Sequence, residues 1–244
     1  MVCRAVIFDY IGTLVNCRNY TMEASKLNLH RALVTEGFDV AEDRFLDAYD
    51  LAHEKYRKVR YGQLREVTNL VWVAEALGNL GFDVSTEDCH VKAALNVFFQ
   101  DFIKTLELRE GAKKLLLETK ALGKVGLISN FTYAPVIYKS LRKMGISEFF
   151  NTVVVSEEVG WRKPSDHIFQ DTLNRLQIGA CEAVYIGDSP NEDIKGAKQA
   201  GLKTIFVPSQ FNKLKDLRES KQKPDHIAKD LTAICQNLNQ ILSI

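Results

Sequence analysis

The sequence predicts an α/β fold, a Rossmann-like doubly wound parallel sheet that carries an inserted helical cap domain. Two observations predict it. Continuous apolar runs alternate with helical patterns over most of the chain, as expected of parallel strands that are covered on both faces. That alternation stops between about residues 16 and 107, where only helical patterns occur. A chain of 244 residues, 46% of them hydrophobic, is long enough for a core domain with an insertion.

The predicted core takes its strands from short apolar runs that each end in polar or small residues. Five runs are clear, at Ala5–Phe8, Val125–Ile128, Thr152–Val155, Ala183–Ile186 and Lys203–Val207, and a weaker sixth is at His226–Ala228. The amphipathic patterns between them predict helices over Gly111–Leu122, Ala134–Met144, Ser165–Leu176 and Glu192–Ala200. We therefore assign residues 1–15 and 108–244 to an α/β core domain.

The insertion follows the first strand and has long helical patterns without a convincing strand. Helices are expected over Met22–Thr35, Ala41–Val59, Val67–Leu80 and Ser85–Leu106, the last one starting with the capping sequence Ser85-Thr86-Glu87-Asp88. We assign residues 16–107 to a helical cap domain. Because it is inserted between the first and second strands, it should lie directly above the end of the first strand.

Composition restricts the kind of protein and its partners. The formal net charge of +1 gives no reason to expect nucleic acid or an acidic membrane surface as a partner. The five cysteines are scattered without a Cys-x-x-Cys pair, which is typical of reduced thiols in a cytoplasmic protein. Asp9 interrupts the N-terminal apolar run, so we expect neither a signal peptide nor a membrane span. The expected protein is a cytoplasmic monomer or homodimer that binds a small anionic molecule.

Polar side chains follow four of the predicted strands. Asp9 follows the first strand, and Ser129-Asn130 follows the second. The third segment is Gly160-Trp161-Arg162-Lys163-Pro164, and the fourth, Gly187-Asp188-Ser189-Pro190-Asn191-Glu192-Asp193, brings two further carboxylates. Open α/β sheets bind ligands at the carboxyl ends of their strands, so we expect these groups to form one site.

These residue types suit phosphoryl transfer. A carboxylate can attack phosphorus only if the phosphoryl charge is screened, and Mg²⁺ held by Asp9 and Asp188 would screen it. Lys163 and Ser129 would neutralise and orient the remaining phosphoryl oxygens. Asp193 would hold either Lys163 or a metal-bound water.

The four segments, in this order and approximate spacing, resemble those of the haloacid dehalogenase-like superfamily, in the branch with a helical cap after the first motif. The resemblance implies that Asp9 is the nucleophile, acting with Lys163, and that Asp188 and the main-chain carbonyl of Ile11 are ligands for Mg²⁺. It also implies that Ser129, Asn130 and Lys163 bind the phosphoryl group.

One departure from this family concerns catalysis directly. The first motif of the family is Asp-x-Asp-Gly-Thr, and its second aspartate is Ile11 here. In the phosphatase members that aspartate protonates the leaving group and later activates water. The chain therefore keeps the nucleophile and lacks the usual acid/base, unless a histidine of the cap replaces it.

Three interpretations follow from this loss. The first is a Mg²⁺-dependent phosphatase of small phosphorylated metabolites with an atypical acid/base. The second is a hydrolase of another bond, either a dehalogenase, which would need a different fourth motif, or a phosphonatase, which would need a Schiff-base lysine from the cap. Candidate lysines are Lys26, Lys55, Lys58, Lys92 and Lys104. The third is a binding protein without catalysis.

A basic and aromatic cluster lies near Gly62 in the insertion. It consists of Arg57, Lys58, Arg60, Tyr61 and Arg65. The simplest interpretation is a charged helix end and loop, and the alternative is a cap surface that recognises an anionic substrate. Phe98 and Phe102, one helical turn apart, are expected to be core residues.

Overall fold

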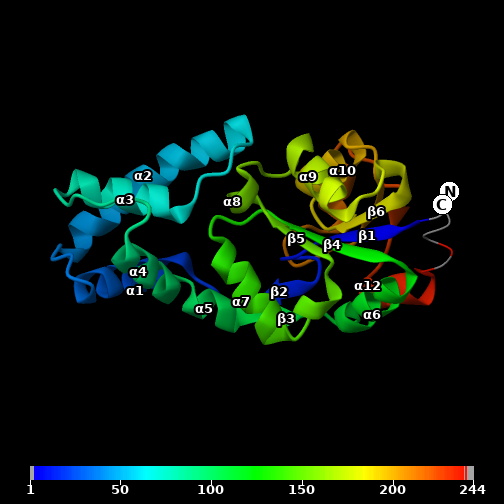
Figure 1. The fold of residues 1–244 in the computed structure, drawn as a ribbon, viewed down its shortest axis with the longest axis horizontal. Helices are drawn as coiled ribbons and strands as arrows, with labels where there is room; N and C mark the ends of the chain where they lie inside the picture. The colour runs from blue at the N-terminus through cyan, green and yellow to red at the C-terminus, as the bar shows by residue number, and fades with distance from the viewer. Residues whose placement is uncertain (1–2, 239, 241–244) are drawn as a thin grey trace.

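The centre of the molecule is a sheet of six strands in the order β5-β4-β1-β6-β7-β8, in which every neighbouring pair is parallel (Figure 1). The structure is a computed structural model, and it describes residues 3–238 and 240. The strands are β1 (Ala5–Asp9), β4 (Lys124–Ser129), β5 (Thr152–Val155), β6 (Ala183–Gly187), β7 (Lys203–Phe206) and β8 (His226–Ile227). The predicted α/β, Rossmann-like fold class is confirmed.

Helices bury both faces of this sheet. On β1, Val6 and Phe8 pack with residues of one helical layer, whereas Ala5 and Ile7 pack with residues of the other. The first layer contains α6 (Ala112–Leu122), α7 (Ala134–Met144) and α12 (Leu231–Gln236), and the second contains α9 (Asp166–Leu176) and α10 (Lys195–Gln199). Successive strand side chains point to opposite faces, so a strand covered twice must be apolar throughout.

Shorter elements complete the core. They are α8 (Ser156–Val159), α11 (Leu214–Glu219), the single turns η1 (Ser147–Phe149) and η2 (Ala180–Glu182), and the wide turn η3 (Pro190–Ile194). The turn η3 and helix α10 together occupy the range predicted as one helix, Glu192–Ala200. Helix α10 ends before Gly201, whose positive φ of 84° provides the stop that the sequence predicts.

Five of the six helices between β1 and β4 form what we call the helical lobe. They are α1 (Met22–Thr35), α2 (Glu42–Gln63), α3 (Asn69–Asn79), α4 (Cys89–Phe98) and α5 (Gln100–Thr105). Asp88 caps α4 by accepting hydrogen bonds from the backbone N–H groups of His90 and Val91, within the predicted capping sequence. In Figure 1 the lobe lies beyond the end of the sheet that is opposite to the chain termini.

The structure differs from the predicted helical pattern at three places. The helix predicted over Ser85–Leu106 begins only at Cys89 and is interrupted at Phe99, and α2 continues past Val59 to Gln63. Two three-residue strands, β2 (Val15–Cys17) and β3 (Leu106–Leu108), form an antiparallel pair where the chain enters and leaves the lobe. Neither strand was expected from the sequence.

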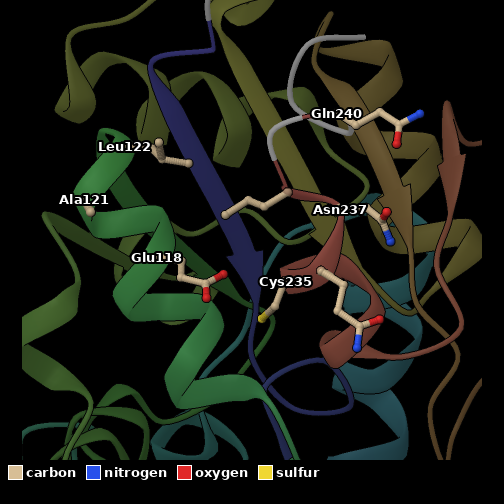
Figure 2. A pocket seen from close by; sticks show the side chains of 8 residues that line it. Glu118, Ala121, Leu122, Cys235, Asn237 and Gln240 are labelled. Carbon is tan, nitrogen blue, oxygen red and sulfur yellow. The ribbon is translucent and has the colours of Figure 1, made fainter.

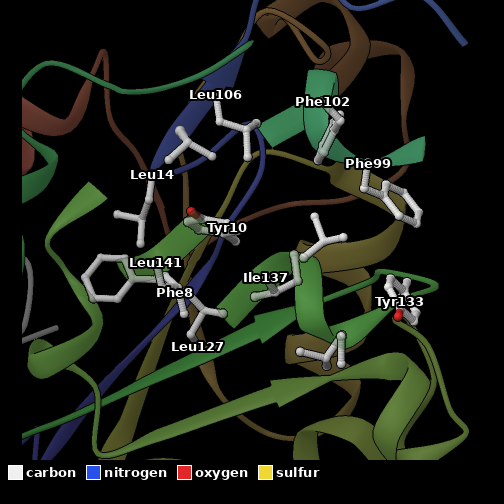
Figure 3. Close-up of a cluster of buried hydrophobic side chains, with 14 of the residues drawn as sticks. Phe8, Tyr10, Leu14, Phe99, Phe102, Leu106, Leu127, Tyr133, Ile137 and Leu141 are labelled. Carbon is white, nitrogen blue, oxygen red and sulfur yellow. The ribbon is translucent and has the colours of Figure 1, made fainter. Parts of the chain in front are cut away.

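A single hydrophobic cluster joins the lobe to the sheet. Figure 3 shows Phe8 of β1, Ile137 and Leu141 of α7, and Phe99 and Phe102 near α5 in this cluster. Phe99 stacks on the ring of Tyr133, which precedes α7, with ring centroids 5.6 Å apart. The lobe is therefore packed onto the core through apolar contacts near α5.

A polar connection crosses between the lobe and the core on another side. We call Leu64–Glu66, the segment after α2, the strap. The strap pairs with the loop after α8: the Glu66 N–H donates to Gly160 O (3.0 Å) and the Arg162 N–H donates to Leu64 O (3.1 Å). The pairing places the strap beside the loop that carries Lys163.

Within the described residues, no helix has both the length and the apolar character needed to cross a membrane. A cavity of about 570 Å³ lies between α6 and α12, near the amino ends of the strands (Figure 2). Glu118 is the only charged side chain among the described residues that line it. This cavity thus lacks the several charged groups that phosphoryl chemistry requires.

Candidate active site

The carboxyl edge of the sheet brings the predicted site residues together. Asp9 ends β1, Ser129 ends β4, Asp188 follows β6, and Asp193 lies in η3. A cleft of about 510 Å³ is lined by these four residues and by Ile11, among others. Parallel strands bring their carboxyl ends to one edge, so segments far apart in the sequence meet there.

The turn after Asp9 is tight and depends on a glycine. The N–H groups of Leu14 and Val15 both donate to Tyr10 O, at 2.8 and 3.1 Å. Gly12 has a φ of 103°, and a Cβ at this position would lie 2.6 Å from Asp188 Oδ2. The absence of a side chain at Gly12 therefore allows the first and fourth segments to approach each other closely.

Lys163 is the central cation of the site. Its Nζ lies 2.7 Å from Asp9 Oδ1 and 2.7 Å from Asp193 Oδ1, and the side chain is buried. Nζ also lies 3.0 Å from the hydroxyl of Tyr185, which itself donates to Asp193 Oδ1. Asp193 Oδ2 accepts a hydrogen bond from the Ser189 N–H (2.8 Å). Lys163 and Asp193 are therefore fixed to each other and to the strand end that carries Asp9.

The second carboxylate near Asp9 is held from the other side of the cleft. Asp188 Oδ2 accepts hydrogen bonds from the Ser209 hydroxyl and from Asn212 Nδ2 (3.0 Å). Asp9, Asp188 and Asp193 each offer an oxygen within 4.8 Å of the others. Asp9 Oδ2 is buried and has no hydrogen-bond partner in the part of the chain that the structure describes.

The crowding of buried carboxylates shifts their acidity. Burial raises the pKa of Asp9 to about 8, although the nearby Lys163 ammonium acts in the opposite direction. Burial and the charge of Asp193 raise the pKa of Asp188 to about 6. Burial alone would lower the pKa of Lys163, but Asp193 and Asp9 raise it well above its usual range. Three carboxylates thus share one buried ammonium, and the site has a deficit of positive charge.

Two of the predicted residues have a more specific environment than the sequence indicated. Ser129 is buried and lines the cleft. Asn130 also lines the cleft, but its side chain holds the neighbouring loop: Oδ1 accepts from the Lys163 N–H (2.7 Å), and Nδ2 donates to Lys163 O (3.0 Å) and to Glu192 Oε2 (3.0 Å). The amide of Asn130 therefore orients the backbone of Lys163.

An ion-pair network borders the cleft, and sequence reasoning missed most of it. Glu66 of the strap has a fully buried side chain that accepts from Arg60 Nε (2.6 Å) and from the Ser156 hydroxyl. Arg162 Nη1 lies 3.5 Å from Glu66 Oε2, and Arg162 Nη2 lies 3.2 Å from Glu192 Oε1. Arg60 belongs to the basic cluster that the sequence singled out, whereas no local signal marks Glu66.

Arg109 is a second residue that the sequence gave no reason to select. Its guanidinium donates to the carbonyl oxygens of Gly12, Thr13 and Pro208, the last at 2.8 Å. It thereby ties the turn after Asp9 to the segment that carries Ser209. An arginine just after the predicted helical insertion does not by itself indicate that its guanidinium binds these carbonyl oxygens.

Known proteins resemble this chain in sequence. The family model of the haloacid dehalogenase-like hydrolases matches residues 3–201. The chain is 35% identical to a glyceraldehyde 3-phosphate phosphatase of Methanocaldococcus jannaschii over 97% of this chain and 99% of that protein. It is 30% identical to the glyceraldehyde 3-phosphate phosphatase of Methanopyrus kandleri over 84% of this chain and 83% of that protein.

Solved structures share the fold at lower sequence identity. The crystal structure of a 2-haloacid dehalogenase from Pseudomonas syringae pv. tomato superposes with a TM-score of 0.65, at 20% identity and 99% coverage of both chains. The family model matches far more than half of the sequence, and the relative from Methanocaldococcus jannaschii is 35% identical over nearly the whole chain. The chain belongs to the haloacid dehalogenase-like hydrolases.

Proposed function

We propose that this protein is a Mg²⁺-dependent phosphatase of small phosphorylated metabolites, with Asp9 as the nucleophile. The observation that carries the proposal is the buried group of Asp9, Asp188 and Asp193 around Lys163. The two relatives named above as glyceraldehyde 3-phosphate phosphatases support a phosphorylated substrate. We further propose that residues 16–107, which include the helical lobe, act as a cap domain over residues 1–15 and 108–244.

The residues of the site fit Mg²⁺. The donors are hard oxygens without a soft ligand, which favours Mg²⁺ over zinc. Asp9 Oδ2 is buried without a partner among the described residues, and such an orphaned carboxylate oxygen is costly unless a cation or donor meets it. Asp9, Asp188 and the main-chain carbonyl of Ile11 would hold the ion. When bound, it would neutralise phosphoryl charge and keep Asp9 ionised.

The protein's own groups then have distinct tasks. An oxygen of Asp9 forms a bond to phosphorus while the bond between phosphorus and the leaving-group oxygen breaks. The leaving-group oxygen keeps the electron pair of the broken bond. Lys163 and Ser129 donate hydrogen bonds to phosphoryl oxygens, and Asn130 orients the Lys163 backbone. Ile11 carries no proton to give, so the departing oxygen must leave as an anion or find its proton in solvent.

Hydrolysis of another bond is the competing function. A phosphonatase would need a lysine of the helical lobe in the cavity, but none of the five candidates is among the described lining residues. Four of them are paired with carboxylates: Lys26 with Asp50, Lys55 with Glu75, Lys92 with Glu87, and Lys104 with Asp101. A phosphatase is therefore the function that the site supports best.

The test is a substrate panel measured with and without Mg²⁺. It contains phosphate esters, including glyceraldehyde 3-phosphate, together with 2-chloropropionate and phosphonoacetaldehyde. We expect release of inorganic phosphate only with Mg²⁺, and at least 10²-fold less in Asp188→Asn. The control is Asp225→Asn, which should keep its activity. Asp225 accepts a hydrogen bond from Thr204 outside the cleft. Chloride release, or cleavage of phosphonoacetaldehyde without ester hydrolysis, would contradict the proposal.

A further inference from the structure

A third cavity, of about 320 Å³, lies between the helical lobe and the segment after β4, and we call it the aromatic chamber. More than half of its lining residues carry aromatic rings, among them Tyr49, Trp72, Phe98 and Phe102. Its volume is at the lower end of the range of small-molecule pockets, about 300–1,000 Å³. Phe98 and Phe102 are buried, as the sequence analysis expects of core residues, and they also line this cavity.

The aromatic chamber adjoins the cleft of the carboxylates. Five residues line both cavities: Arg60, Tyr61, Phe102, Asn130 and Phe131. In phosphoryl transfer the leaving group departs opposite to the attacking oxygen. Asp9 attacks from the edge of the sheet, so the leaving group points away from the sheet and toward the lobe. The chamber is the space that lies next to the cleft on that side.

The chamber wall has two polar groups with free hydrogen-bonding capacity. Asn69 is buried, and its Oδ1 accepts no hydrogen bond from any described residue, so it is open to a donor on a ligand. Arg60 donates to Glu66 only through Nε, which leaves its Nη atoms without a protein partner in the described ranges. Arg60 stands where the two cavities meet, so these N–H groups are placed to stabilise charge on a leaving oxygen.

The chemistry at Ile11 restricts the leaving group independently. Without a carboxylic acid at that position, the leaving oxygen departs without a proton from this residue. General acid catalysis is typically worth about 10²–10⁴-fold, and it matters least for acidic leaving groups. A phenol is more acidic than an alkyl alcohol and has a planar ring. A phenolic leaving group therefore needs little protonation, and its ring also fits against the aromatic side chains of the chamber.

From these observations we infer that the substrate is an aryl phosphate, a phosphate monoester of an aromatic hydroxyl whose ring enters the aromatic chamber. This inference rests on the proposed phosphatase function and names its substrate class. The ring stacks among Trp72, Phe98 and Phe102, and the phenolate oxygen departs beside Arg60. Three-carbon sugar phosphates lack a group that fills the chamber and are poor substrates.

The experiment must separate ring recognition from leaving-group acidity. Phenyl phosphate and hexafluoroisopropyl phosphate release alcohols of similar acidity, but only the first has a planar ring. With Mg²⁺ we expect kcat/KM for phenyl phosphate to exceed that for hexafluoroisopropyl phosphate by about tenfold or more. Trp72→Leu should bring the two values to within about threefold. Phe45→Leu, a buried change in the same lobe that does not line the chamber, should preserve the difference.

A binding measurement keeps the inference testable whatever the catalytic result, and whether or not Trp72→Leu folds. Phenylphosphonate and methylphosphonate resist hydrolysis, and calorimetry with the Mg²⁺-loaded protein compares their affinities. We expect about tenfold tighter binding of phenylphosphonate than of methylphosphonate. If no ester is hydrolysed but this preference exists, the phosphatase proposal fails and the chamber assignment stands. If both esters are hydrolysed equally well and both phosphonates bind equally, the phosphatase proposal stands and the aryl phosphate inference is wrong.

Discussion

Ile11 lies between Asp9, the proposed nucleophile, and the glycine that shapes the turn, and its apolar side chain lines the cleft. An apolar residue here removes one negative charge from a site that already holds three carboxylates around one lysine. It also removes the group that would protonate the leaving oxygen. If Asp9 acts as proposed, we therefore expect an aspartyl phosphate to form more readily from activated esters than from alkyl esters.

Restoring a carboxylate tests this interpretation of Ile11. In Ile11→Asp we expect turnover of alkyl phosphates to rise by about 10²-fold or more, because their poor leaving groups need a proton. Activated aryl phosphates should gain less in the formation of the aspartyl phosphate. Steady-state and burst kinetics on both classes measure the two effects.

The matched control is Ile11→Asn, because asparagine has the shape of aspartate but cannot donate a proton as an acid. Ile11 is partly buried against the hydrophobic cluster, so a thermal melt of both variants must accompany the kinetics. A stably folded Ile11→Asp protein with no gain over Ile11→Asn on any alkyl ester would show that the missing acid does not limit the enzyme.

The single residues of the site were predictable to different degrees. Asp9, Lys163 and Asp188 could be selected because each follows a predicted strand in a short motif, and the structure brings them together. Glu66 could not be selected, since its partners Ser156 and Arg162 lie about ninety residues further along the chain. A contact of that range leaves no local pattern in the sequence.

At the scale of elements, the strap connects the helical lobe to the loop that carries Lys163. Glu66 forms ion pairs with both Arg60 and Arg162, and all three side chains are buried. Removal of one partner from a buried network leaves charges without compensation. The strap thus couples the position of the lobe to the position of the loop that carries Lys163.

We predict that Glu66→Ala lowers the free energy of unfolding by about 3–5 kcal/mol, as for other broken buried ion pairs. Urea unfolding followed by circular dichroism measures this. The control is Glu54→Ala, which removes an exposed pair with Arg57 on α2 and should leave the free energy of unfolding nearly unchanged. Equal effects of the two substitutions would mean that the Glu66 network contributes nothing beyond a surface pair.

The element boundaries show where periodic patterns fail. The pattern over Ser85–Leu106 continues across Phe99, but the structure interrupts the helix there so that Phe98 contacts the lobe ring Tyr49 while Phe99 stacks on Tyr133. The strands β2 and β3 are three residues each and lie about ninety residues apart in the sequence. Both features are decided by packing between distant segments, which a local pattern does not contain.

At the scale of the whole molecule, the site exists only when distant parts of one chain are folded together. Asp9 is near the N-terminus, Lys163 comes from the loop after α8, and Asn212 lies beyond β7. The continuous hydrophobic cluster that joins sheet and lobe fixes these segments and places the aromatic chamber beside the carboxylates. The fold class followed from the alternation of strands and helices, whereas the chamber required the packed structure.

The most direct test of the central claim is detection of phosphate on Asp9 itself. The protein is mixed with phenyl phosphate and Mg²⁺, quenched within milliseconds, reduced with borohydride and mapped by mass spectrometry. Borohydride converts an aspartyl phosphate to homoserine, so we predict homoserine at position 9 in the wild type and none in Asp9→Asn. Release of inorganic phosphate by the wild type without any modification of Asp9 would contradict a nucleophilic role for this residue.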